Sequence, residues 1–248
     1  MTFDLYALRF RFATCKLRDF SSNTLRGAFG SSLKKIDADA YRRYFAPKAT
    51  LGSGPSGLAD HPRPFVFRIM DRMEAGLNLF LSRDPDAVDL FTRVMAELGT
   101  LRSVTGKEPV RLSLRATERK VQRLRVRFLT PTELKGAEQP DFGILLARIR
   151  DRVSALRELY GDGPLDIDFK GLGERASRVT MTRCELTHVA AERSSRNTGQ
   201  RHSLGGFTGF AEYEGDLAEF EPYLEIARWT GVGRQTVWGK GEIAYEEL

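Results

Sequence analysis

The chain has 248 residues, enough for one large domain or two of ordinary size, and its 41% hydrophobic and 29% charged residues exclude a disordered chain. A net charge of +6 favours a polyanionic partner, and the clustering of cations described below makes nucleic acid the first expectation. Two cysteines and three histidines are too few to indicate a zinc site, so we expect neither a metal nor another cofactor.

The start of the chain, Met-Thr-Phe-Asp-Leu-Tyr, lacks the basic region and the apolar run of a signal peptide. No stretch approaches eighteen consecutive apolar residues. We therefore expect a cytoplasmic protein that does not contact a membrane.

The first half is predicted to run strand, helix, strand, strand, helix, strand. Alternating apolar residues indicate the strands, and recurrence every three to four residues indicates the helices, with Ser22 or Asn23 expected to cap the first helix. The expected elements are 3–12, 23–33, 65–69, 76–82, 84–98 and 109–116.

The second half repeats the same order of elements. The expected elements are 121–129, 141–160, 179–191, 207–214, 217–229 and 241–245, and residues 161–177 fit neither a helix nor a strand. Two consecutive βαββαβ units predict an α+β fold of two tandem ferredoxin-like (RRM-like) domains. We place them at residues 1–118 and 119–248.

A glycine-rich loop lies between the last predicted helix and the last predicted strand. Glycine permits positive φ and close approach of a partner to the backbone, and exposed N–H groups beside cations can hold phosphates. The spacing matches neither the dinucleotide-binding fingerprint nor the P-loop. The residues expected to bind RNA here are Gly231, Gly233, Arg234, Gly239, Lys240 and Gly241.

Three other segments concentrate cations. The polar stretch 192–203 carries Arg193, Arg196, Arg201 and His202, and it is predicted to form a second wall of a phosphate-binding groove or else a simple hairpin tip. Arg123, Arg125 and Arg127 share one face of a strand, either as a phosphate-spaced stripe or as an ordinary solvated face. The first helix adds Arg26, Lys34 and Lys35, and Tyr41 follows it.

His61 stands in a loop between Asp60 and Pro62-Arg63, beside a carboxylate and a cation. A loop histidine is more often an ordinary surface side chain. It is nevertheless one of few groups here that titrate near neutrality, so it is a candidate for proton transfer.

Taken together, these segments resemble the CRISPR-associated RAMP endoribonucleases of the Cas-six class, which cut precursor CRISPR RNA at each repeat. The glycine-rich loop before the last strand is the most family-specific piece. The matching segments are 25–30, 64–67, 128–134, 204–209, 214–217 and 231–241.

The resemblance implies a metal-independent endoribonuclease in which the RNA's own 2′-OH attacks the phosphate, leaving a 2′,3′-cyclic phosphate and a 5′-OH. Its partner would be CRISPR repeat RNA, with other CRISPR-associated proteins as further partners. Relatives carry a histidine directly after the 25–30 segment, where this chain has Ser31. The catalytic base is therefore left open among His61, His202 and Tyr41. The alternative is a non-catalytic RAMP subunit that binds guide RNA in an interference complex.

Overall fold

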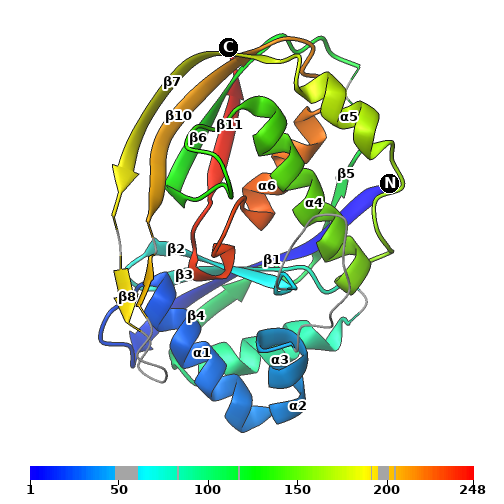
Figure 1. Ribbon diagram of the computed structural model, residues 1–248. Coiled ribbons are helices and arrows are strands. Elements are labelled where there is room, and N and C mark those ends of the chain that lie inside the picture. Colours follow the sequence, from blue (N-terminus) through cyan, green and yellow to red (C-terminus); the bar gives the residue numbers. More distant parts are fainter. Residues whose placement is uncertain (48–60, 83, 117, 191, 195–200, 204) are drawn as a thin grey trace.

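The computed structural model describes residues 1–47, 61–82, 84–116, 118–190, 192–194, 201–203 and 205–248, with backbone alone at 192–194 and 201–203. Its first half contains β1 (Thr2–Cys15), α1 (Ser22–Ile36), α2 (Ala38–Ala40), the π-helical turn η1 (Tyr41–Phe45), β2 (Phe65–Asp71), β3 (Glu74–Leu79), α3 (Asp86–Ala96), β4 (Gly99–Thr105) and β5 (Pro109–Ser113). The second half contains β6 (Arg123–Thr132), α4 (Phe142–Tyr160), α5 (Phe169–Ala176), β7 (Thr180–Val189), β8 (Glu192–Ser194), β9 (Arg201–Ser203), β10 (Gly206–Glu214), α6 (Glu221–Thr230), the 3₁₀ turn η2 (Thr236–Trp238) and β11 (Ile243–Glu247). Figure 1 shows their arrangement.

The first sheet has the strand order β2-β3-β1-β4, and its neighbouring strands are antiparallel. Helix α1 connects β1 to β2, and α3 connects β3 to β4, which is the ferredoxin-like order. Both helices bury their apolar residues, among them Phe29 and Phe91, in one cluster with Phe10, Phe65 and Phe67 of the strands. The predicted order of strands and helices in the first unit is therefore confirmed.

The edge of this sheet differs from the expectation in one respect. The final strand begins at Gly99, ten residues earlier than predicted, and β5 then continues along the other half of β1. Gly106 separates β4 from β5 with a φ of +78°, and a Cβ there would collide with the carbonyl of Ala7. The sequence pattern thus predicted β5, and it missed β4, the strand that takes the last place in the ferredoxin-like sheet.

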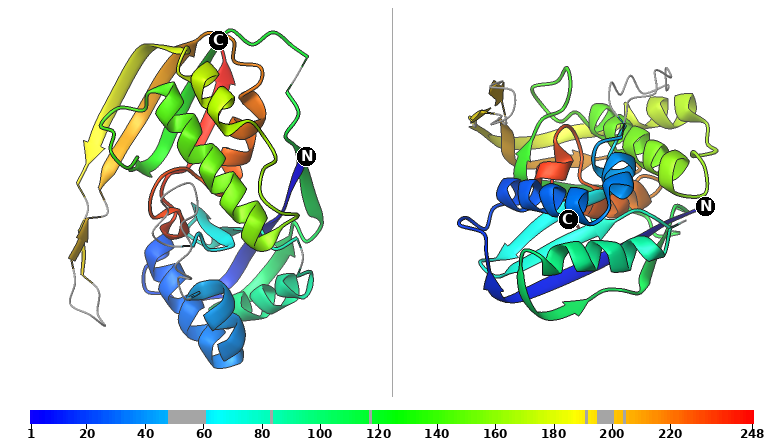
Figure 2. Two further views of the ribbon diagram at one scale, coloured as in Figure 1. Left: turned by 45° about the vertical axis from the view of Figure 1, so that its right-hand side comes forward. Right: turned by 90° about the horizontal axis from the view of Figure 1, so that it is seen from below.

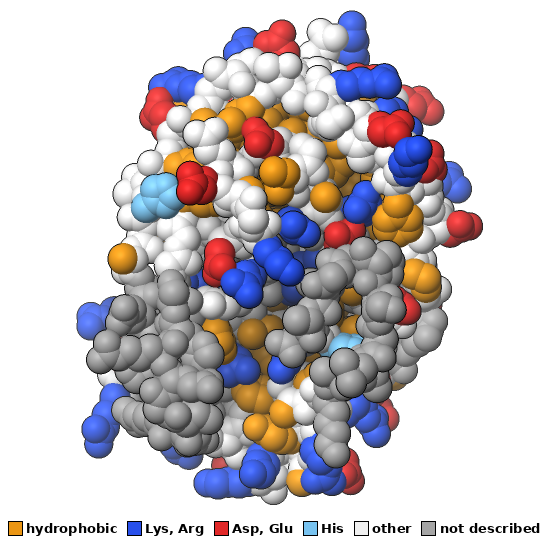
Figure 3. Space-filling model, viewed as in Figure 1, with side chains coloured by type: hydrophobic (Ala, Val, Ile, Leu, Met, Phe, Trp, Pro, Cys, Tyr) orange, Lys and Arg blue, Asp and Glu red, His pale blue; other side chains and the backbone are white. Residues whose placement is uncertain are grey.

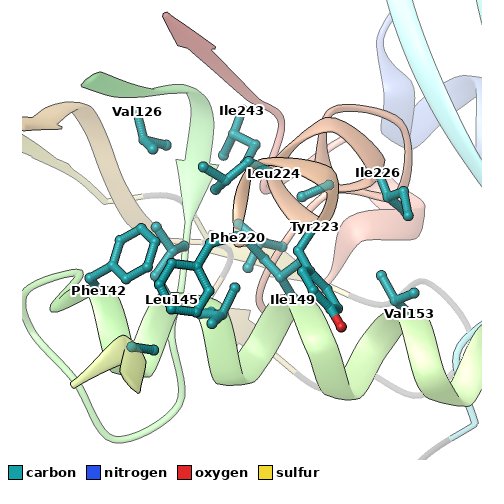
Figure 4. Packing of buried hydrophobic residues seen from close by; sticks show 14 of the residues in the cluster. Val126, Phe142, Leu145, Ile149, Val153, Phe220, Tyr223, Leu224, Ile226 and Ile243 are labelled. Atoms are coloured by element: carbon teal, nitrogen blue, oxygen red, sulfur yellow. The ribbon is translucent and has the colours of Figure 1, made fainter. Parts of the chain in front are cut away.

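The second sheet has the order β11-β6-β10-β7 and is also antiparallel. Helices α4 and α6 pack on one of its faces, where their apolar stripes meet Val126 and Ile243 (Figure 4). Residues 161–177, which had no assignment, contain α5, capped at its N-terminus by the Asp168 side chain. The fold is α+β with two ferredoxin-like units in tandem, as predicted, and the division at 118/119 stays a prediction.

Several element boundaries also differ from the expectation. Ser21, rather than Ser22 or Asn23, caps α1, because its hydroxyl accepts the N–H of Thr24. Strand β6 continues through Pro131 to Thr132, and α6 begins at Glu221 rather than at 217. Pro222 in the first turn of α6 explains its late start, since the fixed φ of proline favours that position.

The two halves share a core. The face of the first sheet that α1 and α3 leave uncovered contributes Phe3, Leu5 and Val66 to the same buried cluster as α4 and α6. Asn78 of β3 also donates to the backbone carbonyl of Trp229 at the end of α6, at 2.9 Å. Figure 2 shows α4 and α6 between the second sheet and the first. In the described part of the chain, no helix has the length and apolar character needed to cross a membrane.

Candidate nucleic-acid interface

The glycine-rich loop folds back on itself and on the end of β6. The N–H of Val232 donates to the Gly241 carbonyl at 2.8 Å, that of Arg234 to the Glu133 carbonyl at 3.0 Å, and that of Gly241 to the Pro131 carbonyl at 3.2 Å. The glycines Gly231, Gly233, Gly239 and Gly241 all have positive φ. The fold of the loop thus accounts for these glycines by itself, and their predicted contact with RNA stays a prediction.

The loop also packs on the first half of the chain. Gly239 lies against Ser22 at the start of α1, and a Cβ at position 239 would collide with the Ser22 side chain. The predicted RNA-binding residues of the first helix and of the loop, far apart in sequence, are therefore on adjoining parts of one surface.

A row of cations and aromatic rings, which we call the ladder, lies at the junction where α1 and η1 meet the glycine-rich loop. Its members are Arg26, Lys34, Tyr41, Phe45 and Trp238. The Arg26 guanidinium lies 5.2 Å from the centre of the Trp238 ring and 4.6 Å from that of Phe45. Phe45 stacks on Tyr41 with 5.2 Å between ring centres, and the ammonium of Lys34 lies 5.8 Å from Tyr41. Arg26, Lys34 and Tyr41 are thereby brought together with the glycine-rich loop. Lys35 is exposed in the same last turn of α1 as Lys34.

His61 is attached to the same neighbourhood through Arg63. The Arg63 guanidinium donates to the His61 carbonyl at 2.9 Å and to the Phe45 carbonyl at 3.3 Å. The hydroxyl of Tyr160 donates to the Pro62 carbonyl at 3.0 Å, which fixes the segment from the other side, and burial raises the pKa of Tyr160 to about 12. This segment places His61 next to the ladder, with Arg63 as an additional cation.

The two cations of the loop have different surroundings. Arg234 is exposed and forms an ion pair with Glu133 at 2.8 Å. Lys240 is buried, its ammonium lies 3.5 Å from the Gly205 carbonyl, and burial lowers its pKa. Arg234 is therefore exposed to solvent, whereas Lys240 lies within the fold, and the predicted contacts of both with RNA stay predictions.

Figure 3 shows Lys and Arg side chains gathered in the middle of the face that carries the glycine-rich loop. In the basic hairpin, β8 pairs with β9 with Arg193 opposite His202 in the register. The predicted roles of the Arg193, Arg201 and His202 side chains, and everything predicted for Arg196, lie outside the described residues.

The arginine stripe of β6 is neutralised by the neighbouring strands. Arg125 forms ion pairs with Glu212 at 2.6 Å and Glu246 at 3.1 Å, and Arg127 pairs with Glu246 at 2.9 Å. Arg123 lies 3.7 Å from Glu214. This pairing favours the ordinary solvated sheet face over the phosphate-binding stripe.

Sequence reasoning missed several residues of this junction. Phe45, Trp238 and Arg63 contribute to the ladder or hold His61, and Arg68 and Arg152 lie buried between the halves. Arg152 had a signal in the sequence, because it stands in the apolar stripe of α4 beside Val153 and three residues after Ile149. Arg68 likewise interrupts an apolar strand. Among the described side chains, no group of three or more His, Cys, Asp or Glu residues is arranged to hold a metal ion.

Comparison with known proteins gives a family match for the second half of the chain. A family model described as CRISPR-associated endoribonuclease Cas6 matches residues 126–243. Solved structures similar to the whole chain include a Thermus thermophilus Cas6 (17% identity, 99% of this chain and 98% of that chain, TM-score 0.60). Others are a Cas6 in a substrate mimic complex (19%, 98% and 99%, TM-score 0.57) and a Cas6b (16%, 99% and 100%, TM-score 0.54).

No curated protein sequence matches the chain. Because the identities to the solved structures are low, these structures support the fold alone. The family model supports a similarity of sequence over the second half of the chain. The resemblance to the Cas-six class is confirmed: residues 126–243 match the family of CRISPR-associated endoribonuclease Cas6, and the whole chain has the fold of Cas6 structures.

Proposed function

We propose that this chain is an endoribonuclease that cuts precursor CRISPR RNA within its repeats, in the cytoplasm and without a metal ion. The observation that carries the proposal is the junction surface, where Arg26, Tyr41 and the His61 segment lie together with the family's glycine-rich loop. The surface combines candidate proton-transfer groups with cations, as attack by an RNA hydroxyl on a phosphate requires.

In the proposed reaction, the 2′-oxygen of one nucleotide attacks the phosphorus that joins it to the next nucleotide. A base accepts the proton of the 2′-OH, the 2′-O–P bond forms, and the P–O5′ bond breaks. A proton returns to the 5′-oxygen, so the products are a 2′,3′-cyclic phosphate and a 5′-OH. His61 is the first candidate base, and His202 and Tyr41 are the others.

Positive charge stabilises the five-coordinate phosphorane. Arg63 donates to the His61 carbonyl, the Lys34 ammonium lies 5.8 Å from Tyr41, and Arg26 lies over Phe45, which stacks on Tyr41. Arg234 is the exposed cation of the loop. Arg26 is held between two rings, so its guanidinium needs little reorganisation to meet developing negative charge.

The test is single-turnover cleavage of repeat RNA in EDTA. The negative control is a repeat with a single 2′-deoxy nucleotide at the cleavage site, which lacks the attacking hydroxyl. The variants are His61→Ala, His202→Ala and Tyr41→Phe. Loss of the base should slow cleavage by about 10²–10⁴-fold. If all three variants cut at the wild-type rate, the base lies elsewhere. If the wild type binds repeat RNA and never cuts it, the non-catalytic guide-RNA subunit is the correct function.

A further inference from the structure

Two nearly buried arginines meet at the junction of the halves. Arg68 of β2 is 5% exposed and Arg152 of α4 is 8% exposed. Arg68 alternates with Val66, and Val66 belongs to the core shared with the second half. Arg68 therefore points out of the first sheet toward α4 and α6, where Arg152 lies.

Their hydrogen bonds leave part of each guanidinium unused. Arg68 donates to the Phe67 carbonyl at 3.4 Å, and its Nε lies 3.5 Å from the Glu242 carboxylate. Arg152 donates from Nε to the Thr230 carbonyl at 3.0 Å, at the negative end of α6. The Nη2 atoms of both side chains are buried and have no hydrogen-bond partner in the described part of the structure.

A third cation lies in the same row of the sheet. Gly76 of β3 is the register partner of both Arg9 on β1 and Arg68 on β2. A Cβ at Gly76 would come within 2.8 Å of the Arg9 guanidinium, so the glycine provides the space that this side chain occupies. Arg9 and Arg68 thus flank Gly76 on one face of the sheet.

The nearby carboxylates do not balance these charges. The Glu242 carboxylate interacts electrostatically with both Arg9 and Arg68. Glu74 also interacts with Arg9, but it forms an ion pair with Arg11 at 2.9 Å. Burial and the neighbouring Arg68 together lower the pKa of Arg152 to about 9, and the group stays charged at neutral pH. Asn78 has an unpartnered Oδ1, but a neutral amide supplies no charge. Buried arginines with unused donors are energetically costly unless an anion completes the site.

We propose that Arg9, Arg68 and Arg152 form a binding site for one phosphate group, between the first sheet, α4 and the end of α6. Guanidinium groups bind phosphate oxygens through paired N–H donors. Arg68 and Arg152, which are close enough to interact electrostatically, each have one unused Nη2 donor. The phosphate belongs to the backbone of the bound RNA; this second statement rests on the proposed function.

The first experiment uses the intact protein without RNA. Its unfolding midpoint is compared in sodium phosphate and in sodium chloride at equal pH and ionic strength. At about ten times the dissociation constant, phosphate should raise the midpoint by about 3–6 °C. Arg68→Met should abolish this increase and leave the midpoint in chloride unchanged or higher, because it removes a costly buried charge.

Two further variants make this experiment specific. Arg102→Met removes the same charge from an exposed position on β4 and should keep the full phosphate effect. Gly76→Ala removes the space for Arg9 without changing the charge and should reduce the phosphate effect. Equal wild-type midpoints in phosphate and chloride, or an undiminished phosphate effect in Arg68→Met, would overturn the site.

The second experiment measures binding of repeat RNA in a phosphate-free buffer. Arg68→Met should weaken binding about 10-fold or more and lower the slope of affinity against salt by about one, whereas Arg102→Met should change neither. A normal RNA affinity in Arg68→Met together with a lost phosphate effect would assign the site to free phosphate and overturn its role with RNA. Cleavage is scored separately, so an inactive wild type that still responds to phosphate would contradict only the proposed function.

Discussion

The guanidinium of Arg26 lies 5.2 Å from the ring centre of Trp238, so the first helix and the glycine-rich loop contact each other from opposite ends of the chain. The same guanidinium also lies 4.6 Å from the ring centre of Phe45. The position of the loop therefore depends on the first half of the chain, although the loop belongs to the second sheet.

A double-mutant cycle tests this contact. Arg26→Met and Trp238→Ala should each lower the free energy of unfolding, and their effects should be coupled by about 0.5–2 kcal/mol, the range of a partly desolvated cation–π pair. Urea unfolding of the four proteins measures the coupling. Strictly additive effects would show that the two side chains stabilise the fold independently.

Gly239 should be sensitive to a side chain for two separable reasons. Its φ is +75°, and a Cβ would collide with Ser22. Gly136 has a φ of +78° with no atom within 4 Å of its would-be Cβ, so it is a matched control for backbone strain alone. Gly136→Ala should cost about 1 kcal/mol of unfolding free energy, and Gly239→Ala clearly more.

The same comparison has an internal check. Adding Ser22→Gly to Gly239→Ala removes the collision and should recover the excess over Gly136→Ala, apart from the loss that Ser22→Gly causes by itself. Equal losses for the two alanine variants would mean that the loop does not press on α1.

Arg234 should contribute to RNA binding, whereas Arg127 should not. Arg234→Gln should weaken repeat-RNA affinity and lower its salt slope by about one, as expected for one lost phosphate contact. Glu133→Gln should strengthen binding, because it releases Arg234 from its ion pair at 2.8 Å. Arg127→Gln is the control, since Arg127 is already paired with Glu246. Equal losses for both arginine variants would attribute binding to overall charge.

Tyr160 should make the protein less stable in alkali. Burial raises its pKa to about 12 in the folded state, against about 10 when unfolded. Its contribution is complete below pH 10 and is lost as the pH rises toward 12, because the unfolded chain ionises first. Urea unfolding between pH 9 and 11.5 should show a decline that is shallower by about 2 kcal/mol in Tyr160→Phe.

The free energy of unfolding at neutral pH gives a second measurement. The hydroxyl of Tyr160 donates to the Pro62 carbonyl, so Tyr160→Phe should also lose about 1 kcal/mol at pH 7. Parallel pH curves for the two proteins would contradict the assignment of this decline to Tyr160.

The sequence alone determined the order of elements, because the period of the apolar pattern follows directly from local backbone geometry. It therefore predicted two ferredoxin-like units, and the quoted segments carried the resemblance to the Cas-six class. It misplaced a boundary where one local contact decides, as when the Ser21 hydroxyl rather than Asn23 caps α1, and it missed β4 directly after the second helix.

Tertiary structure decided which charges remain available. For Arg125 and Arg127 the sequence left open a binding stripe or an ordinary solvated face, because their partners, Glu212 and Glu246, come from other strands whose register the sequence does not specify. Conversely, sequence reasoning did not single out Arg152, and only the packing of α4 and α6 against the first sheet buries it near Arg68. Whether a cation is paired, exposed or buried depends on residues distant in the chain, and that is the physical reason why the sequence predicted the surface but not its individual contacts.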